Sequence, residues 1–367
     1  MNLFASAQAA GGTPHVIARE LADQLQDARG HNVGFIYVTS PLARDFSGLV
    51  ASLRVSTGID AWVGTAGHGV CASGVEHWDK PAAVVLTCRL AEGSYRLLPT
   101  MAEAGAVADA GGGGLAAGLG VVHADPRNGA VMDIVAALSR ERSAYLVGGL
   151  TSSDGSYPQI AGGEVIDGGV SGILLGGRLS VAVGLSQGCT PIGAAHEITR
   201  CEGQIIAGLD RRRAYDVMCE DVGIAEGADP RPWLTNVHAA LPVPGSNEAD
   251  YVVRNLIGID PRQGLVAVAE NLQAGERVMF VRRDQESARK DLERMLAGLK
   301  GRLTAPPKAG LYFSCVARGP NLFGDESHEM RAIRETFGDI PVAGFFGNGE
   351  ISNDRIYGYT GVLTLFS

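Results

Sequence analysis

The sequence repeats one pattern of apolar and polar segments three times. The three copies span Asn32–Gly69, Leu119–Ser153 and Lys308–Glu350. Each copy begins with an apolar run of strand type, continues through an amphipathic stretch of helical length, and ends in a second apolar run that leads into glycines. A segment that recurs in this way is one supersecondary unit, and its copies bury their apolar faces against one another. The repeat therefore predicts three strand–helix–strand units whose glycine-rich ends can converge on one region.

Further strands and helices are expected outside the copies. Thr13 followed by Pro14 is typical of a helix start, and Asp284 precedes a helix with an apolar stripe at i, i+3, i+4 and i+7. Strands outnumber helices, and the helices cross between strands, so the expected class is α/β, with α+β as the variant, built from mixed sheets. The additional strands are expected at Ala82–Leu90, Val170–Leu175, Ser180–Leu185, Gly264–Val268, Arg277–Val281 and Tyr359–Phe366.

The sequence pattern changes at Gln187–Pro191, where Gln-Gly-Cys-Thr-Pro interrupts a run of residues typical of strands. A chain of 367 residues with 46% hydrophobic content can form two or three domains with substantial cores. We therefore expect two domains. Residues 1–188 would hold the first two copies, and residues 189–367 would hold the third copy with an additional helical section.

Charge and cysteine usage restrict the class of protein. Forty acidic and 31 basic residues give a formal net charge of −9, which argues against nonspecific binding to nucleic acid. The N-terminus lacks the features of a signal peptide, and no apolar stretch reaches the ~18 residues of a membrane-spanning helix. The six cysteines form no CxxC pair. We expect a cytoplasmic protein with free thiols and no contact with a membrane.

Two glycine-rich segments resemble nucleotide-binding loops. Gly67–Ala72 fits G-x-G-x-x-A after a strand, but no helical stripe follows it, so the amides would not face a pyrophosphate. Gly111–Gly114 lacks the Gly-Lys-Ser/Thr of a P-loop. Neither segment predicts a nucleotide site.

Two His-Glu pairs and one cysteine are candidate catalytic groups. His196-Glu197 and His328-Glu329 each begin like a zinc-protease motif, but neither has a second histidine four residues later. Cys315 can be read as a nucleophile with His328 as its base, although nothing in the sequence fixes their geometry. The alternative for Cys315 is a buried structural thiol.

A polar cluster in the second half of the chain contains Asp250, Tyr251, Arg254 and Asn255. Asp250 and Arg254 are four residues apart, which suits an ion pair on one face of a helix. The alternative is that Arg254 binds a ligand carboxylate in a bidentate manner.

Further polar residues follow the two strands expected in the third copy. Ser314, Arg318 and Asn321 follow the first strand, and Asn348 and Glu350 follow the second. Backbone amides exposed by glycines, together with Arg and Asn side chains, can form a site for a small polar ligand at strand ends. Asn348 lies between two glycines, so a role in a tight turn is the alternative for this residue.

Several of these segments together resemble the FIST superfamily. The motifs are SQGCTPIG at 186–193, DYVVRNLIGID at 250–260, SCVARGPNLFG at 314–324, GFFGNGEIS at 344–352 and YGYTGVL at 357–363. The first half is similar to the family's N-terminal domain and the remainder to its C-terminal domain. The resemblance implies a sensory module for small ligands, with amino acids as the suggested class, that signals through a separate partner such as a histidine kinase. Some relatives bind haem and sense nitric oxide, and His68 is the candidate haem ligand here.

The residue patterns, together with what the resemblance implies, predict a cytoplasmic sensory protein, rather than an enzyme, that binds a small carboxylate-bearing metabolite between two domains and needs no cofactor. Two alternatives remain open, namely a haem-based gas sensor and an enzyme that uses Cys315. Arg254 and Arg318 are expected to bind the anion, and Glu350 and Asp250 to bind an ammonium group or order the arginines. The remaining candidates for hydrogen bonds to the ligand are Asn348, Ser314, Asn321 and Tyr251.

Overall fold

The computed structural model describes residues 3–110, 115–161, 163–177, 179–225, 228–243, 250–324 and 327–367. It divides into two compact units. Unit 1 comprises residues 1–186 and 292–367, and unit 2 comprises residues 187–291. The glycine run Gly111–Gly114 lies outside the described residues.

Unit 1 is built from the three copies of the repeat. In each copy the two strands pair in parallel, and a helix connects them, as a parallel pair requires. The predicted strand–helix–strand units are therefore confirmed. They are β2 (Val33–Thr39), α2 (Phe46–Thr57) and β3 (Ala61–Gly67); β8 (Ala117–Ala124), α4 (Val131–Arg142) and β9 (Tyr145–Leu150); and β22 (Ala309–Cys315), α9 (His328–Phe337) and β23 (Val342–Gly347).

Each parallel pair lies within a six-stranded sheet, and the three sheets have the same plan. An antiparallel strand flanks the first repeat strand, and a further strand lies outside it. These two strands are β6 (Ala82–Cys88) and β1 (Phe4–Ala10) in the first sheet, β12 (Val170–Gly176) and β7 (Tyr95–Met101) in the second, and β26 (Thr360–Phe366) and β13 (Val181–Gln187) in the third. Short helical segments in unit 1 are α1 (Pro14–Gln24), η1 (Ser40–Asp45), α3 (Ala106–Asp109) and α8 (Pro320–Phe323).

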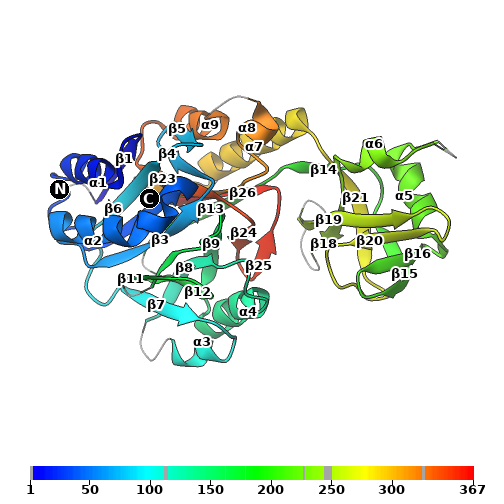
Figure 1. The fold of residues 1–367 in the computed structure, drawn as a ribbon, viewed down its shortest axis with the longest axis horizontal. Coiled ribbons are helices and arrows are strands. Elements are labelled where there is room, and N and C mark those ends of the chain that lie inside the picture. The colour runs from blue at the N-terminus through cyan, green and yellow to red at the C-terminus, as the bar shows by residue number, and fades with distance from the viewer. Residues whose placement is uncertain are drawn as a thin grey trace. The chain divides into compact units, whose positions relative to one another are not determined.

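A short hairpin after each copy completes the sheet of a different copy. The hairpin of copy 1 pairs with β23, that of copy 2 with β3, and that of copy 3 with β9. Figure 1 shows the last of these, with the red strands β24 and β25 beside β9. The exchange forms a closed ring, so each six-stranded sheet contains strands from two copies. The hairpins are β4 (Gly69–Ala72) with β5 (Val75–Trp78), β10 (Gln159–Ala161) with β11 (Glu164–Ile166), and β24 (Glu350–Ser352) with β25 (Arg355–Tyr357).

The inner faces of the three sheets share one core. Tyr37, His123 and Phe313, one from each copy, pack with ring centroids 5.4 to 6.3 Å apart. Phe345 packs against all three. Burial lowers the pKa of His123 to about 3, so this imidazole is neutral and acts as part of the core.

One glycine in each copy allows the two parallel strands to pair. A Cβ atom at this position would lie 1.7 to 1.8 Å from a backbone carbonyl oxygen of the facing strand. Only glycine fits such a gap, because real side chains cannot approach backbone so closely. The facing pairs are Gly64 with Ile36, Gly148 with Val122, and Gly344 with Tyr312.

Unit 2 is an eight-stranded sheet whose strands pair antiparallel, and it is inserted in the sequence between β13 and the helix that leads to β22. Its apolar core includes Val217, Met218 and Phe280. Its elements are β14 (Cys189–Pro191), β15 (His196–Glu202), β16 (Ile205–Leu209), β17 (Arg212–Arg213), α5 (Ala214–Val222), α6 (Arg231–Leu234), β18 (Val237–Pro242), β19 (Tyr251–Asp260), β20 (Leu265–Val268) and β21 (Arg277–Arg283). The division between the two units in the sequence falls within helix α7 (Gln285–Arg302), after residue 291.

The expected α/β class with mixed sheets is confirmed, as are the additional strands and the helix starts at Thr13 and Asp284. The helical pairing of Asp250 with Arg254 is wrong, because Arg254 lies on strand β19. The division at residues 188 and 189 remains a prediction about domains, and the structure groups residues 292–367 with residues 1–186. Across the described ranges, no helix combines the length and apolar character needed to cross a membrane.

We expect Gly64→Ala to destabilise the protein by about 3 kcal/mol or more, because the added methyl group would overlap the carbonyl oxygen of Ile36. Gly48→Ala is the matched control, since Gly48 lies in α2 with open space around it. That variant should be stabilised by about 0.5–1 kcal/mol. Chemical denaturation measures both changes. Equal stability of the two variants would contradict the described pairing of β2 with β3.

Candidate functional site

The second strands of the three copies meet at their C-terminal ends. Ser152 Oγ donates to the carbonyl oxygen of Phe346 at 2.5 Å and accepts from the backbone N–H of His68 at 2.9 Å. The backbone N–H of Asn348 donates to Leu150 O at 3.0 Å. The expected convergence of the three strand ends is therefore confirmed.

This junction is tightly packed. A Cβ atom at Gly67 would lie 2.8 Å from Phe346 O, and one at Gly347 would lie 2.7 Å from Leu150 O. The Asn348 amide donates to Thr151 O at 3.4 Å, so Asn348 contributes to the junction itself. Close backbone contacts therefore occupy the junction itself.

Arg318 lies three residues beyond the end of β22 and is fully buried. Its Nε and Nη2 atoms lie 2.9 and 2.8 Å from Glu329 Oε1. Helix α9 carries Glu329 in its first turn. A buried ion pair of this kind persists only when further hydrogen bonds satisfy its remaining polar atoms.

Glu329 receives several such hydrogen bonds. Tyr312 donates its hydroxyl to Oε1 at 2.5 Å, and Ser314 donates its hydroxyl to Oε2 at 3.1 Å. The backbone N–H of Gly319 also donates to Oε2, at 3.1 Å. The carboxylate of Glu329 is therefore saturated with donors from β22 and the loop that follows it.

Glu76 comes from the exchanged hairpin strand β5 and caps the N-terminus of α9. Its Oε1 atom accepts from the backbone N–H groups of Glu329 and Met330 at 3.1 and 3.3 Å. Burial and the nearby charge of Glu329 raise the pKa of Glu76 to about 7. The position of α9 thus depends on a carboxyl group from another copy of the repeat.

Two buried atoms near this ion pair have no hydrogen-bond partner among the described residues, Arg318 Nη1 and Glu350 Oε1. The other carboxyl oxygen of Glu350 accepts from the N–H and hydroxyl of Thr360 at 3.1 and 2.7 Å. Burial raises the pKa of Glu350 to about 8, although the nearby charge of Arg318 opposes this shift. Buried polar atoms almost always have partners, so an unpaired donor and an unpaired acceptor in one cluster require an explanation.

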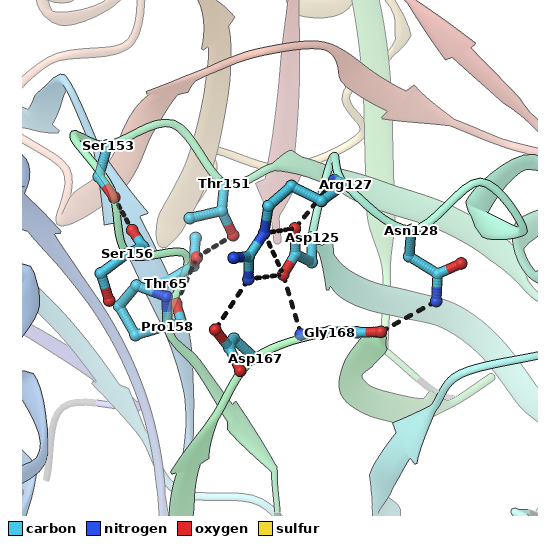
Figure 2. Close-up of polar contacts among 10 residues, drawn as sticks. All are labelled: Thr65, Asp125, Arg127, Asn128, Thr151, Ser153, Ser156, Pro158, Asp167 and Gly168. Carbon is cyan, nitrogen blue, oxygen red and sulfur yellow. Dashed lines mark hydrogen bonds and ion pairs between the residues drawn. The ribbon is translucent and has the colours of Figure 1, made fainter.

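The second copy provides an internal comparison, shown in Figure 2. Arg127 lies three residues beyond the end of β8, as Arg318 does beyond β22. Its Nε atom lies 3.0 Å from Asp125 Oδ1, its Nη2 atom lies 2.8 Å from Asp167 Oδ2, and its guanidinium packs 4.6 Å from the ring of Tyr157. The side chain of Arg127 is 51% exposed, whereas the carboxyl group of Asp125 is buried and fully paired. The same loop position therefore leaves unpaired buried atoms in copy 3 but not in copy 2.

The sequence-predicted residues fall in both units. Ser314, Arg318 and Glu350 lie in the cluster described above, and the Asn321 amide donates to Val316 O at 2.9 Å in the adjoining loop. His68 is half-buried at the strand junction.

Three other candidates belong to unit 2. Arg254 Nε lies 2.8 Å from Glu270 Oε2, and the Tyr251 hydroxyl donates to Cys189 O at 2.6 Å. Asp250 is half-buried just before β19. Their role in ligand binding remains a prediction.

Sequence reasoning missed Glu329 and Glu76. In the sequence, Glu329 belongs to a His-Glu pair that begins like a zinc motif, yet it lies four residues before Ile333 and so shares the buried face of α9. That spacing was a usable signal for an inward-facing carboxylate. No local signal identifies Glu76, because the hairpin exchange brings it to α9.

Family comparison agrees with this architecture. The family model described as FIST N domain matches residues 32–212, and the one described as FIST C domain matches residues 214–353. The chain belongs to the FIST family. FIST domains are sensory domains of signalling proteins. The boundary between the two matches lies at β17, inside unit 2.

Curated relatives share part of the chain. An uncharacterized protein of Mycobacterium tuberculosis is 34% identical over 214 residues, covering 55% of each chain. An uncharacterized protein of Mycobacterium bovis is 34% identical over 216 residues, covering 55% of this chain and 54% of its own. F-box only protein 22 of Pongo abelii is 35% identical over 74 residues, covering 20% of this chain and 18% of its own. The chain spans about half the length of the mycobacterial relatives it matches.

We expect slow alkylation of Cys315 at pH 7. Burial and the nearby charge of Glu350 raise the pKa of this thiol well above its usual range, and the thiolate is the reactive form. The half-buried Cys201 serves as the internal reference. Mass spectrometry of labelled peptides measures both rates. Fast labelling that disappears in Cys315→Ser would instead support the alternative of an enzyme with a Cys315 nucleophile.

Proposed function

We propose that this FIST protein is a sensor for a small polar metabolite that carries a carboxylate and an amine, and that it signals through a separate partner protein such as a histidine kinase. The supporting observation is the pair of unpaired buried atoms, Arg318 Nη1 and Glu350 Oε1. A ligand with one acceptor group and one donor group would satisfy both. An amino acid has this combination.

The chemistry assigns one ligand group to each residue. The ligand carboxylate would accept from Arg318 Nη1, while Nε and Nη2 stay on Glu329. The ligand ammonium would donate to Glu350 Oε1. A zwitterion adds no net charge to the cluster, which matters because an uncompensated charge is costly at a buried site.

Binding at this cluster requires opening, because Arg318 and Glu350 are buried. The ligand would thus favour a conformation in which the loop after β22 has moved. Glu329 links that loop to α9, and Glu76 links α9 to the hairpin of another copy. Displacement of α9 is therefore the proposed signal to the partner.

Arg318→Lys should weaken ligand binding about tenfold or more. Lysine keeps the positive charge beside Glu329 but cannot supply the third guanidinium nitrogen. Arg127→Lys is the matched control, since Arg127 occupies the equivalent loop without an unpaired buried atom. Its affinity should equal that of the natural protein. Equal weakening in both variants, or in neither, would exclude the Arg318 site.

The ligand for this comparison comes from a thermal-shift screen of amino acids, small organic acids, nucleotides and haem. A ligand at 100 times its Kd stabilises the protein by about 2.7 kcal/mol. Stabilisation by haem alone, with a Soret band, would support the alternative of a haem-based gas sensor. Stabilisation by no compound would contradict the proposed ligand class.

Ligand affinity should depend on pH in opposite directions for two ligand types. An ammonium group lowers the pKa of Glu350 in the complex, so the affinity of an amino acid should rise from pH 6 to about 8, the pKa in the free protein. A carboxylate without an amine raises that pKa, so its affinity should fall above pH 8. Calorimetric titration measures both profiles. Glu350→Gln should flatten them, and a persisting slope in that variant would assign the titration to another group.

A further inference from the structure

His196 lies between two carboxylates in unit 2. Its Nδ1 atom is 2.6 Å from Asp210 Oδ2, and its Nε2 atom is 2.8 Å from Asp221 Oδ2. The three residues come from different elements: β15 carries His196, the β16–β17 turn carries Asp210, and the last turn of α5 carries Asp221. The side chains of His196 and Asp221 are only 14% and 15% exposed.

Both contacts require a proton on both ring nitrogens. An ionised carboxylate only accepts hydrogen bonds, and a neutral imidazole has a single N–H. The described geometry therefore belongs to the charged imidazolium. Burial lowers the pKa of His196, but the hydrogen bonds to Asp210 and Asp221 outweigh it, so the net shift is upward.

The charged histidine stabilises two features that are unfavourable alone. Asp210 and Arg211 both have positive φ angles, 48° and 65°, in the left-handed region that favours glycine. Asp221 places a negative charge near the C-terminal end of α5, where the helix dipole is also negative. When His196 loses one proton, one of the two carboxylates faces a ring-nitrogen lone pair. The hydrogen bond that held either the β16–β17 turn or the end of α5 is then lost.

Other charged groups surround the histidine on the neighbouring elements. Arg277 on β21 donates to Ala195 O, and its charge acts on Asp210. Arg212, which precedes α5, forms an exposed ion pair with Glu220 on that helix, and Asp216 of the same helix lies nearby. The ion pair with Arg212 lowers the pKa of the Glu220 carboxyl, which opposes protonation of Glu220 near neutral pH.

We propose that His196 is a proton-operated clamp that holds α5 and the β16–β17 turn against β15 and releases them as the pH rises. This device lies in unit 2 and is independent of the ligand proposed for unit 1. Because the folded-state pKa is above the unfolded value of about 6.5, the stabilisation is fully present below pH 6.5 and is lost as the pH rises through the folded pKa. Between pH 6.5 and the folded-state pKa of His196, the equilibrium constant for docking α5 and the turn against β15 falls up to about tenfold per pH unit.

The test uses the full chain and follows the His196 ring by NMR, with the signal assigned through His196→Gln. We expect titration above pH 6.5 and, after correction for intrinsic exchange rates, lower amide protection in α5 at pH 8.5 than at pH 6. Asp221→Asn should move the titration towards 6.5 and abolish the difference in protection.

Glu220→Gln is the matched control, because it removes the neighbouring carboxylate on α5 whose partner, Arg212, is always charged. It should retain the pH-dependent protection of the natural protein. Titration of His196 at or below pH 6.5 in the natural protein would overturn the proposal, and so would unchanged α5 protection. The comparison of α5 protection at the two pH values uses the natural protein alone, so it stands even if a variant fails to fold.

Discussion

The hairpin exchange among the three copies is the constraint on which the rest of unit 1 depends. Each six-stranded sheet needs strands from two copies, so no copy can complete its own sheet. The exchange also brings the three strand ends together at one junction. Glycine at the facing positions Gly64, Gly148 and Gly344 allows the parallel pairs to form, because any Cβ atom there would overlap the backbone of the partner strand.

The candidate site is a consequence of that ring. Arg318 and Ser314 belong to copy 3, whereas Glu76 reaches α9 only because the hairpin of copy 1 joins the sheet of copy 3. Glu350 begins the hairpin that copy 3 gives to copy 2. A change at the Arg318–Glu329 pair is thus connected to elements of the other copies through hydrogen bonds and strand pairing. Coupling of that kind suits a protein whose ligand must alter a distant surface.

Much of the fold could be predicted from the sequence, because the repeat has a clear apolar period and its strands and caps follow local rules. The repeat also allowed the glycine turns to converge, but it did not specify that they would meet. The source of each sheet's last two strands could not be predicted, since a four-residue strand such as Gly69–Ala72 carries no information about its partner. For the same reason, the sequence could not identify Glu76 as a neighbour of α9. Helical spacing suggested a pair for Asp250 and Arg254, but this segment forms strand β19, because residues 251–255 pair with β18 and residues 256–260 pair with β20.

The three copies differ at their central aromatic positions and in the arginines of the loops after their first strands. The central positions carry Tyr37, His123 and Phe313, so the core tolerates different aromatic groups while keeping the same packing. The loop arginines differ more. Arg127 is half exposed beside two aspartates, whereas Arg318 is buried with one paired glutamate and one unpaired nitrogen. Copy 2 closes its shorter loop with a half-exposed arginine and no unpaired atom on that arginine. The buried arginine of copy 3, with its unpaired nitrogen, is therefore the observation that supports the proposed ligand site.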